Sequence, residues 1–298
     1  MLKKIKLSSY VVLMSLVNLV LYQYPFFTFV LNTSNSKSVN GVLLLLSLIV
    51  ASLVLNALVF YIGLYVLRIV GKWLLALLFH ISAIAVYFIN SYGVIIDRTM
   101  IGNVLNTDYD ESTSFLSFGI LLYIVFLGIL PSLLLFKFEI IRPTFKRFLI
   151  HSVSTLLFLG LFVFVNSSNW LWIDKNSKTL GALVMPWSYV VNTCRHYSHL
   201  NKKNEKQILL PDATIRNDEK SVAVLVIGES ARSSNFSLYG YEKNTNPLLS
   251  QIEGLKHFKA ESCATYTTAG LKCILEHKNT SKLYEILPNY LYRNDVEV

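Results

Sequence analysis

Five long runs without any Asp, Glu, Lys or Arg lie in the first 165 residues and constrain the fold more than any other feature. At about 1.5 Å per residue, the first four runs are long enough as helices to cross the roughly 30 Å hydrocarbon core of a bilayer, and the fifth is at the lower limit for a span. The sequence is 53% hydrophobic and 15% charged, which excludes an ordinary soluble protein. We therefore expect a transmembrane domain of five helices over residues 1–165. The runs cover residues 10–31, 42–67, 73–95, 115–136 and 149–165.

Two prolines lie inside these runs. Pro25 belongs to the first run and Pro131 to the fourth, and each predicts a kink because proline cannot donate the helical hydrogen bond. The first run is too long for the apolar region of a cleaved signal peptide, and no small-residue cleavage site closes it. We expect it to remain in the mature protein.

Basic residues in the short loops predict the orientation, because loops that carry Lys or Arg resist translocation. A cytoplasmic N-terminus leaves only Lys37 and Arg98 in the short outer loops. With five helices, everything after Val165 then lies outside, which in a bacterium is the periplasm. The net charge of +9 is interpreted as this topology signal, and no nucleic-acid partner is expected. The basic residues placed inside are Lys3, Lys4, Lys6, Arg68, Lys72, Lys137, Arg142, Lys146 and Arg147.

The loop between the third and fourth runs carries polar residues at a helical spacing. Asn103, Thr107 and Glu111 recur every four residues, so a helix would align them in one stripe at the membrane surface. Such a stripe could bind a lipid head group, with the amide and hydroxyl on phosphate or glycerol oxygens and the carboxylate on an ammonium. The alternative is a solvated loop helix without a ligand.

The segment 166–220 combines polar and aromatic residues. Rings at this density after a membrane span are typical of the head-group layer, so we expect a connector that lies along the membrane. Its last part, 201–220, is rich in charge and predicts a linker to a soluble domain. The aromatic residues are Trp170, Trp172, Trp187, Tyr189 and Tyr197.

Residues 221–227 form a short apolar run rich in Val and Ile, followed at once by Gly228, Glu229 and Ser230. Such a run predicts a buried parallel strand, and ligands of open α/β sheets bind at the carboxyl ends of strands. Glu229 is therefore a candidate site residue. The alternative is an ordinary solvated turn residue.

Two of the three cysteines, Cys263 and Cys273, bracket a stretch that is rich in threonine. Because the predicted compartment is oxidising, we expect these two to form a disulfide and Cys194 to remain an unpaired, partly buried thiol. The bond would hold the threonine-rich turn in place. The turn contains three candidate nucleophiles, Thr265, Thr267 and Thr268.

Three motifs resemble one protein family. The sequence from Gly228 to Tyr241, the triplet Thr245-Asn246-Pro247 and the cysteine spacing around Thr267 are similar to the bacterial phosphoethanolamine transferases that modify lipopolysaccharide. The five spans and the polar stripe resemble them too. The resemblance implies an inner-membrane protein whose periplasmic α/β domain is alkaline-phosphatase-like and contains zinc. It also implies transfer of phosphoethanolamine from phosphatidylethanolamine to lipid A or the core oligosaccharide.

The resemblance also implies roles for individual residues. Glu229 corresponds to the first zinc ligand, and Thr267, four positions after the first cysteine, corresponds to a nucleophile that also contacts the metal. The stripe of Asn103, Thr107 and Glu111 corresponds to contacts with the donor lipid. A zinc ion lowers the pKa of bound water strongly and has a comparable effect on a coordinated hydroxyl, which would activate a threonine.

The sequence departs from the family in one important respect. The family completes its zinc site with an Asp-His pair and further histidines well beyond the second cysteine, whereas this sequence ends at Val298. We therefore expect residues 221–298 to form an incomplete, truncated α/β domain. Two rival hypotheses follow: an inactive membrane remnant, or a phosphoglycerol transferase of the same superfamily. A sulfatase is disfavoured because the sequence contains no Cys-x-Pro-x-Arg motif. Lys272, where many relatives have proline, is a smaller departure.

Overall fold

The computed structural model describes residues 3–35, 38–107, 109–201, 207–214, 220–228, 231–258, 261–263, 267–278 and 283–298. The chain divides into two compact units, Met1–Asn201 and Lys202–Val298, which are described separately.

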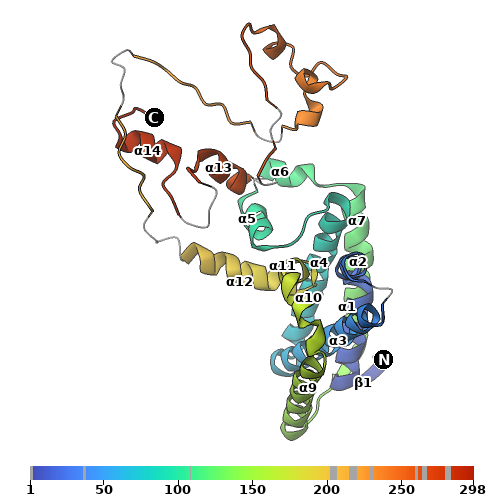
Figure 1. Ribbon diagram of the computed structural model, residues 1–298. Helices are drawn as coiled ribbons and strands as arrows, with labels where there is room; N and C mark the ends of the chain where they lie inside the picture. The colour runs from blue at the N-terminus through green and yellow to red at the C-terminus, as the bar shows by residue number, and fades with distance from the viewer. Residues whose placement is uncertain are drawn as a thin grey trace. The chain divides into compact units, whose positions relative to one another are not determined.

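The first unit is a bundle of helices (Figure 1). Its longest helices pack side by side, α3 against α1, α4 and α9. The membrane half contains α1 (Leu7–Tyr22), α2 (Tyr24–Thr33), α3 (Val39–Leu67), α4 (Ile69–Tyr92), α7 (Phe118–Tyr123), η1 (Ile124–Ile129), α8 (Leu130–Phe136) and α9 (Phe145–Val165). The shorter elements are β1 (Lys3–Lys6), α5 (Arg98–Asn106), α6 (Tyr109–Ser114), β2 (Phe138–Ile141), η2 (Ser167–Asn169), α10 (Trp170–Lys175), α11 (Ser177–Leu183) and α12 (Trp187–Asn201).

The described residues contain four helical stretches that are long and apolar enough to cross a membrane: α3, α4, the stretch Phe118–Phe136 and α9. A fifth span is formed if α1 and α2, which are bent by 62° at Gln23, count as one. The five predicted spans therefore correspond to four continuous helical stretches and one bent pair of helices. Pro25 lies in the first turn of α2, where its missing N–H costs no hydrogen bond.

The second proline also changes the local helix. The stretch that contains Pro131 passes through a π-helical segment, η1, directly before the proline. Pro131 has no N–H group, so the carbonyl of Leu127, four residues earlier, lacks the donor that an α-helix would provide. It accepts a hydrogen bond from the hydroxyl of Tyr22 instead, at 2.5 Å. The expected kink thus takes the form of a wider helical turn held by α1.

Polar side chains connect the bend of the first helix pair to the rest of the bundle. Asn18 Oδ1 accepts hydrogen bonds from Gln23 Nε2 at 2.9 Å and from Asn56 Nδ2 at 3.1 Å. Asn56 Oδ1 in turn accepts from Trp187 Nε1 at 2.8 Å, and Gln23 Nε2 also donates to the carbonyl of Met185. Because Asn18, Gln23 and Asn56 are buried, these bonds position the bend.

Residues 166–201 pack with the membrane helices as part of the first unit. Met185 and Ser188 are completely buried, and Tyr189 donates a hydrogen bond to the carbonyl of Leu78 at 2.8 Å. By contrast, no residue of α9 is buried, which is typical of a helix that faces lipid. The first part of the predicted connector therefore enters the bundle, whereas the last predicted span lies at its periphery.

A small parallel sheet joins the N-terminus to the segment after α8. Strand β1 pairs with β2, with Lys3 opposite Phe138 and Lys6 opposite Ile141. Lys72 of α4 donates a hydrogen bond to the carbonyl of Phe138 at 2.6 Å. The distribution of Lys and Arg predicted that the N-terminus and the segment after α8 lie on the same side of the membrane, and β1 and β2 hydrogen-bond these two segments to each other.

The second unit has little regular structure. Its elements are η4 (Ser233–Asn235), η5 (Ser237–Tyr239), η6 (Leu249–Gln251), α13 (Thr267–Leu275) and α14 (Leu287–Arg293). The strand predicted over 221–227 is wrong: these residues form no strand, and Val222 and Val226 are 92% and 83% exposed. A strand is stable only when neighbouring strands satisfy its backbone, and in the described part of this unit only isolated bridges occur.

Part of the predicted linker is held against α14. Glu285, only 2% exposed, accepts hydrogen bonds from the backbone N–H of Leu210 at 2.6 Å and from Arg293 Nη2 at 2.7 Å. Arg293 also donates to the carbonyl of Leu210 and pairs with Asp212. Its guanidinium holds the pKa of Glu285 below the ordinary value for glutamate. Residues 208–213 are therefore a docked segment.

Candidate functional site

The loop that carries the polar stripe is helical as expected, but the helix does not reach Glu111. Asp97 begins α5 by accepting from the backbone N–H groups of Thr99 and Met100, at 3.0 and 2.8 Å. The helix ends at Asn106, and Thr107 has an extended backbone. Glu111 belongs to the next helix, α6, and the placement of its side chain lies outside the described residues.

Side-chain hydrogen bonds accompany the last backbone bonds of α5. Asn106 Nδ2 donates to the carbonyl of Gly102, and Thr107 Oγ1 donates to the carbonyl of Asn103, both at 2.8 Å. The Asn103 carbonyl also accepts the backbone N–H of Thr107 at 2.8 Å, the last helical bond before the backbone of Thr107 becomes extended. The continuous stripe expected from the sequence is therefore interrupted at Thr107.

The same bonds change what the stripe can do chemically. The Thr107 hydroxyl donates its proton to the carbonyl of Asn103, so the hydroxyl oxygen can only accept a hydrogen bond from a ligand. The side-chain amide of Asn103 is half-buried and makes no hydrogen bond with other residues of the described chain. In this geometry Asn103 is a donor suited to phosphate oxygens, and Thr107 is an acceptor suited to an ammonium.

Helix α12 supports α5 from one side (Figure 1). Asn192 of α12 donates a hydrogen bond to the carbonyl of Ile96 at 2.9 Å, just before α5 begins. The imidazole of His196 lies against Gly102, the residue before Asn103. No local sequence pattern marks His196, because only the fold brings it to α5.

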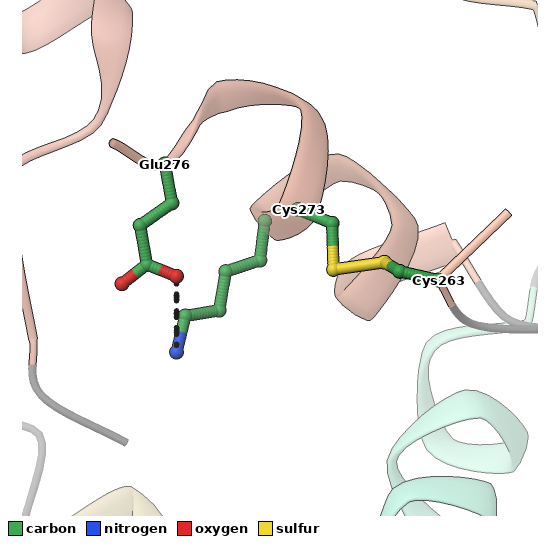
Figure 2. The surroundings of a disulfide bond; sticks show 4 residues. Cys263, Cys273 and Glu276 are labelled. Atoms are coloured by element: carbon green, nitrogen blue, oxygen red, sulfur yellow. Dashed lines mark ion pairs between the residues drawn. A yellow bond between two sulfur atoms is a disulfide. The ribbon is translucent and has the colours of Figure 1, made fainter. Parts of the chain in front are cut away.

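In the second unit, Thr267 is the first residue of α13 and is exposed. Cys263 and Cys273 form the expected disulfide, with their Cα atoms 6.6 Å apart, and Figure 2 shows this bond joining α13 to the segment before it. Cys194 is unpaired as expected, but it is exposed rather than partly buried. A helix N-terminus carries a partial positive charge, which favours a phosphate next to Thr267.

An ion pair joins α13 to the residue that follows it. The Lys272 ammonium is 3.5 Å from a carboxylate oxygen of Glu276, whose side chain is buried (Figure 2). Lys272 therefore pairs with the residue four positions later in its own chain, a spacing that suits an ion pair at the end of a helix.

The remaining candidate residues lie outside what the structure describes. This applies to Glu229 and Thr265, and to the side chain of Thr268. Among the described residues, no three of His, Cys, Asp or Glu gather as a metal ion requires. The described part of the chain therefore does not assemble a zinc site.

Both units match known families. Residues 53–200 match the family described as phosphoethanolamine transferase EptA/EptB, and residues 221–291 match the sulfatase family. Phosphoethanolamine transferase EptA of Helicobacter pylori is 37% identical over 290 residues, which are 96% of this chain and 54% of that protein. Phosphatidylethanolamine transferase Mcr-1 of Escherichia coli is 30% identical over 227 residues, which are 70% of this chain and 41% of that protein.

A solved structure has the same fold. It is the integral membrane protein lipooligosaccharide phosphoethanolamine transferase A (EptA) from Neisseria meningitidis, with a TM-score of 0.77 and 24% identity. The match covers 99% of this chain and 58% of that one. The chain spans about half the length of the curated relatives it matches.

Proposed function

The chain belongs to the phosphoethanolamine transferase family, and we propose that it transfers phosphoethanolamine from phosphatidylethanolamine to lipid A or the lipopolysaccharide core. One observation carries the proposal: Thr267 is exposed at the N-terminus of α13, and the Cys263–Cys273 disulfide fixes that end of the helix. A hydroxyl fixed beside the positive end of a helix can attack a phosphodiester and stabilise the charge that develops.

The reaction proceeds in two halves. In the first, the Thr267 oxygen bonds to the phosphorus of the donor while the bond from phosphorus to the diacylglycerol oxygen breaks. The threonine proton ends on the released diacylglycerol hydroxyl. In the second half, a hydroxyl or phosphate oxygen of the acceptor attacks the phosphorus, and Thr267 leaves and takes a proton back from the acceptor group. Each half exchanges one P–O bond for another, so no oxidant or further reactant is needed.

The α5 region binds the donor in this proposal. Asn103 donates to a phosphate oxygen, Thr107 accepts from the ethanolamine ammonium, and Glu111 adds a carboxylate for the same cation. The free amide of Asn103 and the unused lone pairs of Thr107 support these two roles. The assignment of Glu111 rests on the family resemblance.

A zinc ion is part of the proposal through the family resemblance. Glu229 and Thr267 would contribute two of its ligands in this chain, and zinc usually has three or four from the protein. Such an ion would supply positive charge to the attacking oxygen and to the phosphate.

We also propose that the protein lies in the bacterial inner membrane with a cytoplasmic N-terminus and the second unit in the periplasm. The distribution of Lys and Arg among the short loops supports this orientation. The pairing of β1 with β2 supports it further, because it places two segments with several basic residues at the same end of the bundle.

A covalent adduct tests the function directly. The purified chain is incubated in nanodiscs that contain phosphatidylethanolamine with an isotope-labelled head group, and peptides are sequenced by mass spectrometry. We expect labelled phosphoethanolamine on Thr267 in the unchanged chain, and none in Thr267→Ala. The neighbouring Thr268→Ala is the matched control and keeps the adduct.

Three results would contradict the proposal. An adduct that persists in Thr267→Ala would exclude this nucleophile, and the complete absence of an adduct would favour an inactive remnant. A parallel sample with labelled phosphatidylglycerol distinguishes the remaining rival, because transfer from that lipid alone would indicate a phosphoglycerol transferase.

A further inference from the structure

Of the three residues assigned to the donor site, only Asn103 offers the phosphate a hydrogen-bond donor. A phosphodiester carries a negative charge and is bound in proteins by several donors. In the α5 region the Asn103 amide is one such donor, but the Thr107 hydroxyl proton is already bonded to the carbonyl of Asn103. An element that packs against α5, such as α12, can supply a second donor.

His196 is the side chain that α12 places at this position. If Gly102 carried a Cβ atom, that atom would lie 3.0 Å from Cε1 and 3.3 Å from Nδ1 of the His196 ring. The ring thus lies directly on the backbone of α5, one residue before Asn103. A Cβ atom at residue 102 would make this contact tight, and the ring would have to shift by a few tenths of an ångström.

Packing, rather than hydrogen bonding, fixes this ring. Other side chains of α12 make the hydrogen bonds that hold the helix, including those of Trp187 to Asn56, of Tyr189 to the carbonyl of Leu78 and of Asn192 to the carbonyl of Ile96. Within the part of the chain that the structure describes, neither ring nitrogen of His196 has a hydrogen-bond partner. The ring is half-buried, so one edge remains open to a ligand.

We infer that His196 binds a phosphate oxygen of the donor lipid together with the Asn103 amide, and that Gly102 leaves room for the imidazole at that place. An imidazole offers at least one N–H donor in either protonation state. The inference rests on the proposed function, since it adds a residue to the same donor site. It assigns His196 a binding role before any chemistry takes place.

Lipid binding tests this role without requiring turnover. The purified chain is titrated with phosphatidylethanolamine and with diacylglycerol of the same acyl chains, and native mass spectrometry measures the bound fraction. The two lipids differ by the phosphoethanolamine group. For His196→Leu we expect about tenfold weaker binding of phosphatidylethanolamine, the size of one hydrogen bond to a charged group, and unchanged binding of diacylglycerol.

Three further variants sharpen the test. His196→Gln retains a donor and is expected to bind better than His196→Leu, which also keeps the inference testable if the leucine variant folds poorly. Gly102→Ala should strengthen α5 as a helix and yet weaken phosphatidylethanolamine binding, because the ring must shift by a few tenths of an ångström to make room for the methyl group. Arg195→Gln, on the exposed neighbouring position of α12, is the matched control and should change binding less than twofold.

The outcomes separate the inference from the proposed function. If His196→Leu binds phosphatidylethanolamine as well as the unchanged chain while Asn103→Ala loses it, the role of His196 is wrong and the donor site stands. If the unchanged chain does not prefer phosphatidylethanolamine to diacylglycerol, the donor site itself is wrong. If Arg195→Gln weakens binding as much as His196→Leu, general positive charge rather than the imidazole is responsible, and the inference fails.

Discussion

The hydroxyl of Tyr22 donates a hydrogen bond to the main-chain carbonyl of Leu127, which Pro131 leaves without its helical partner. Tyr22 is completely buried, so its hydroxyl requires a partner as well. One contact therefore satisfies two polar groups and joins α1 to the π-helical segment η1. In a membrane, where water cannot replace the bond, both groups would otherwise remain unsatisfied.

Removal of this hydroxyl should destabilise the first unit. We expect Tyr22→Phe to lower the free energy of unfolding by about 1 kcal/mol, since it removes a buried donor and leaves the Leu127 carbonyl unpaired. Unfolding of the purified protein in detergent or bicelles measures the difference. Tyr24→Phe, at a position 65% exposed, is the control and should have little effect. Equal stability of Tyr22→Phe and the unchanged chain would show that the bond contributes nothing measurable.

The disulfide should stabilise the start of α13. Closing a loop between residues ten apart in sequence removes unfolded-chain entropy worth roughly 3 kcal/mol. We expect the double variant Cys263→Ser/Cys273→Ser to lose hydrogen-exchange protection in α13, and reductant to have the same effect on the unchanged chain. Cys194→Ser, which removes an exposed thiol, should change nothing. Full protection of α13 in the double variant would disprove the stabilising role.

The clamp between Glu285 and Arg293 should make the docked segment 208–213 sensitive to acid. The hydrogen bonds from Arg293 lower the pKa of Glu285 from its ordinary value of 4.5. Its contribution to stability is therefore complete above that value and is lost as the pH falls through the lower pKa of the folded state. Hydrogen exchange of residues 208–213 as a function of pH measures this release.

Glu285→Gln provides the matching variant for that measurement. It should release the segment already at neutral pH and remove the acid transition in the strongly acidic range. Asp212→Asn is the control, because the side chain of Asp212 is largely exposed and its loss should have a smaller effect. An unchanged acid transition in Glu285→Gln would assign the release to another group.

The proposed orientation makes a direct prediction for reporter fusions. A reporter active only in the periplasm should be active when fused after Lys220, and a reporter active only in the cytoplasm should be inactive there. The distribution of basic residues among the loops is the physical reason. Fusions after Lys72, expected inside, are the control and should behave in the opposite way. Reversal of both results would overturn the orientation.

Features that depend on length, composition or short spacing were predictable from the sequence. Long apolar runs indicate membrane helices because each run can satisfy its own backbone within a single helix. The Cys263–Cys273 bond and the helical start of the α5 loop were predictable for a related reason: the groups that interact are close in sequence. The exception was the run 221–227, where apolar composition alone predicted a strand that does not form.

The tertiary structure decided everything that needed a distant partner. A strand requires a neighbour to pair with, and nothing within 221–227 could supply one. The bond from Tyr22 to Leu127, the hydrogen bonds around Glu285 and the contact of His196 with Gly102 join residues far apart in the chain. The sequence around each of these residues does not indicate its partner, because the packing of whole helices determines which side chains meet.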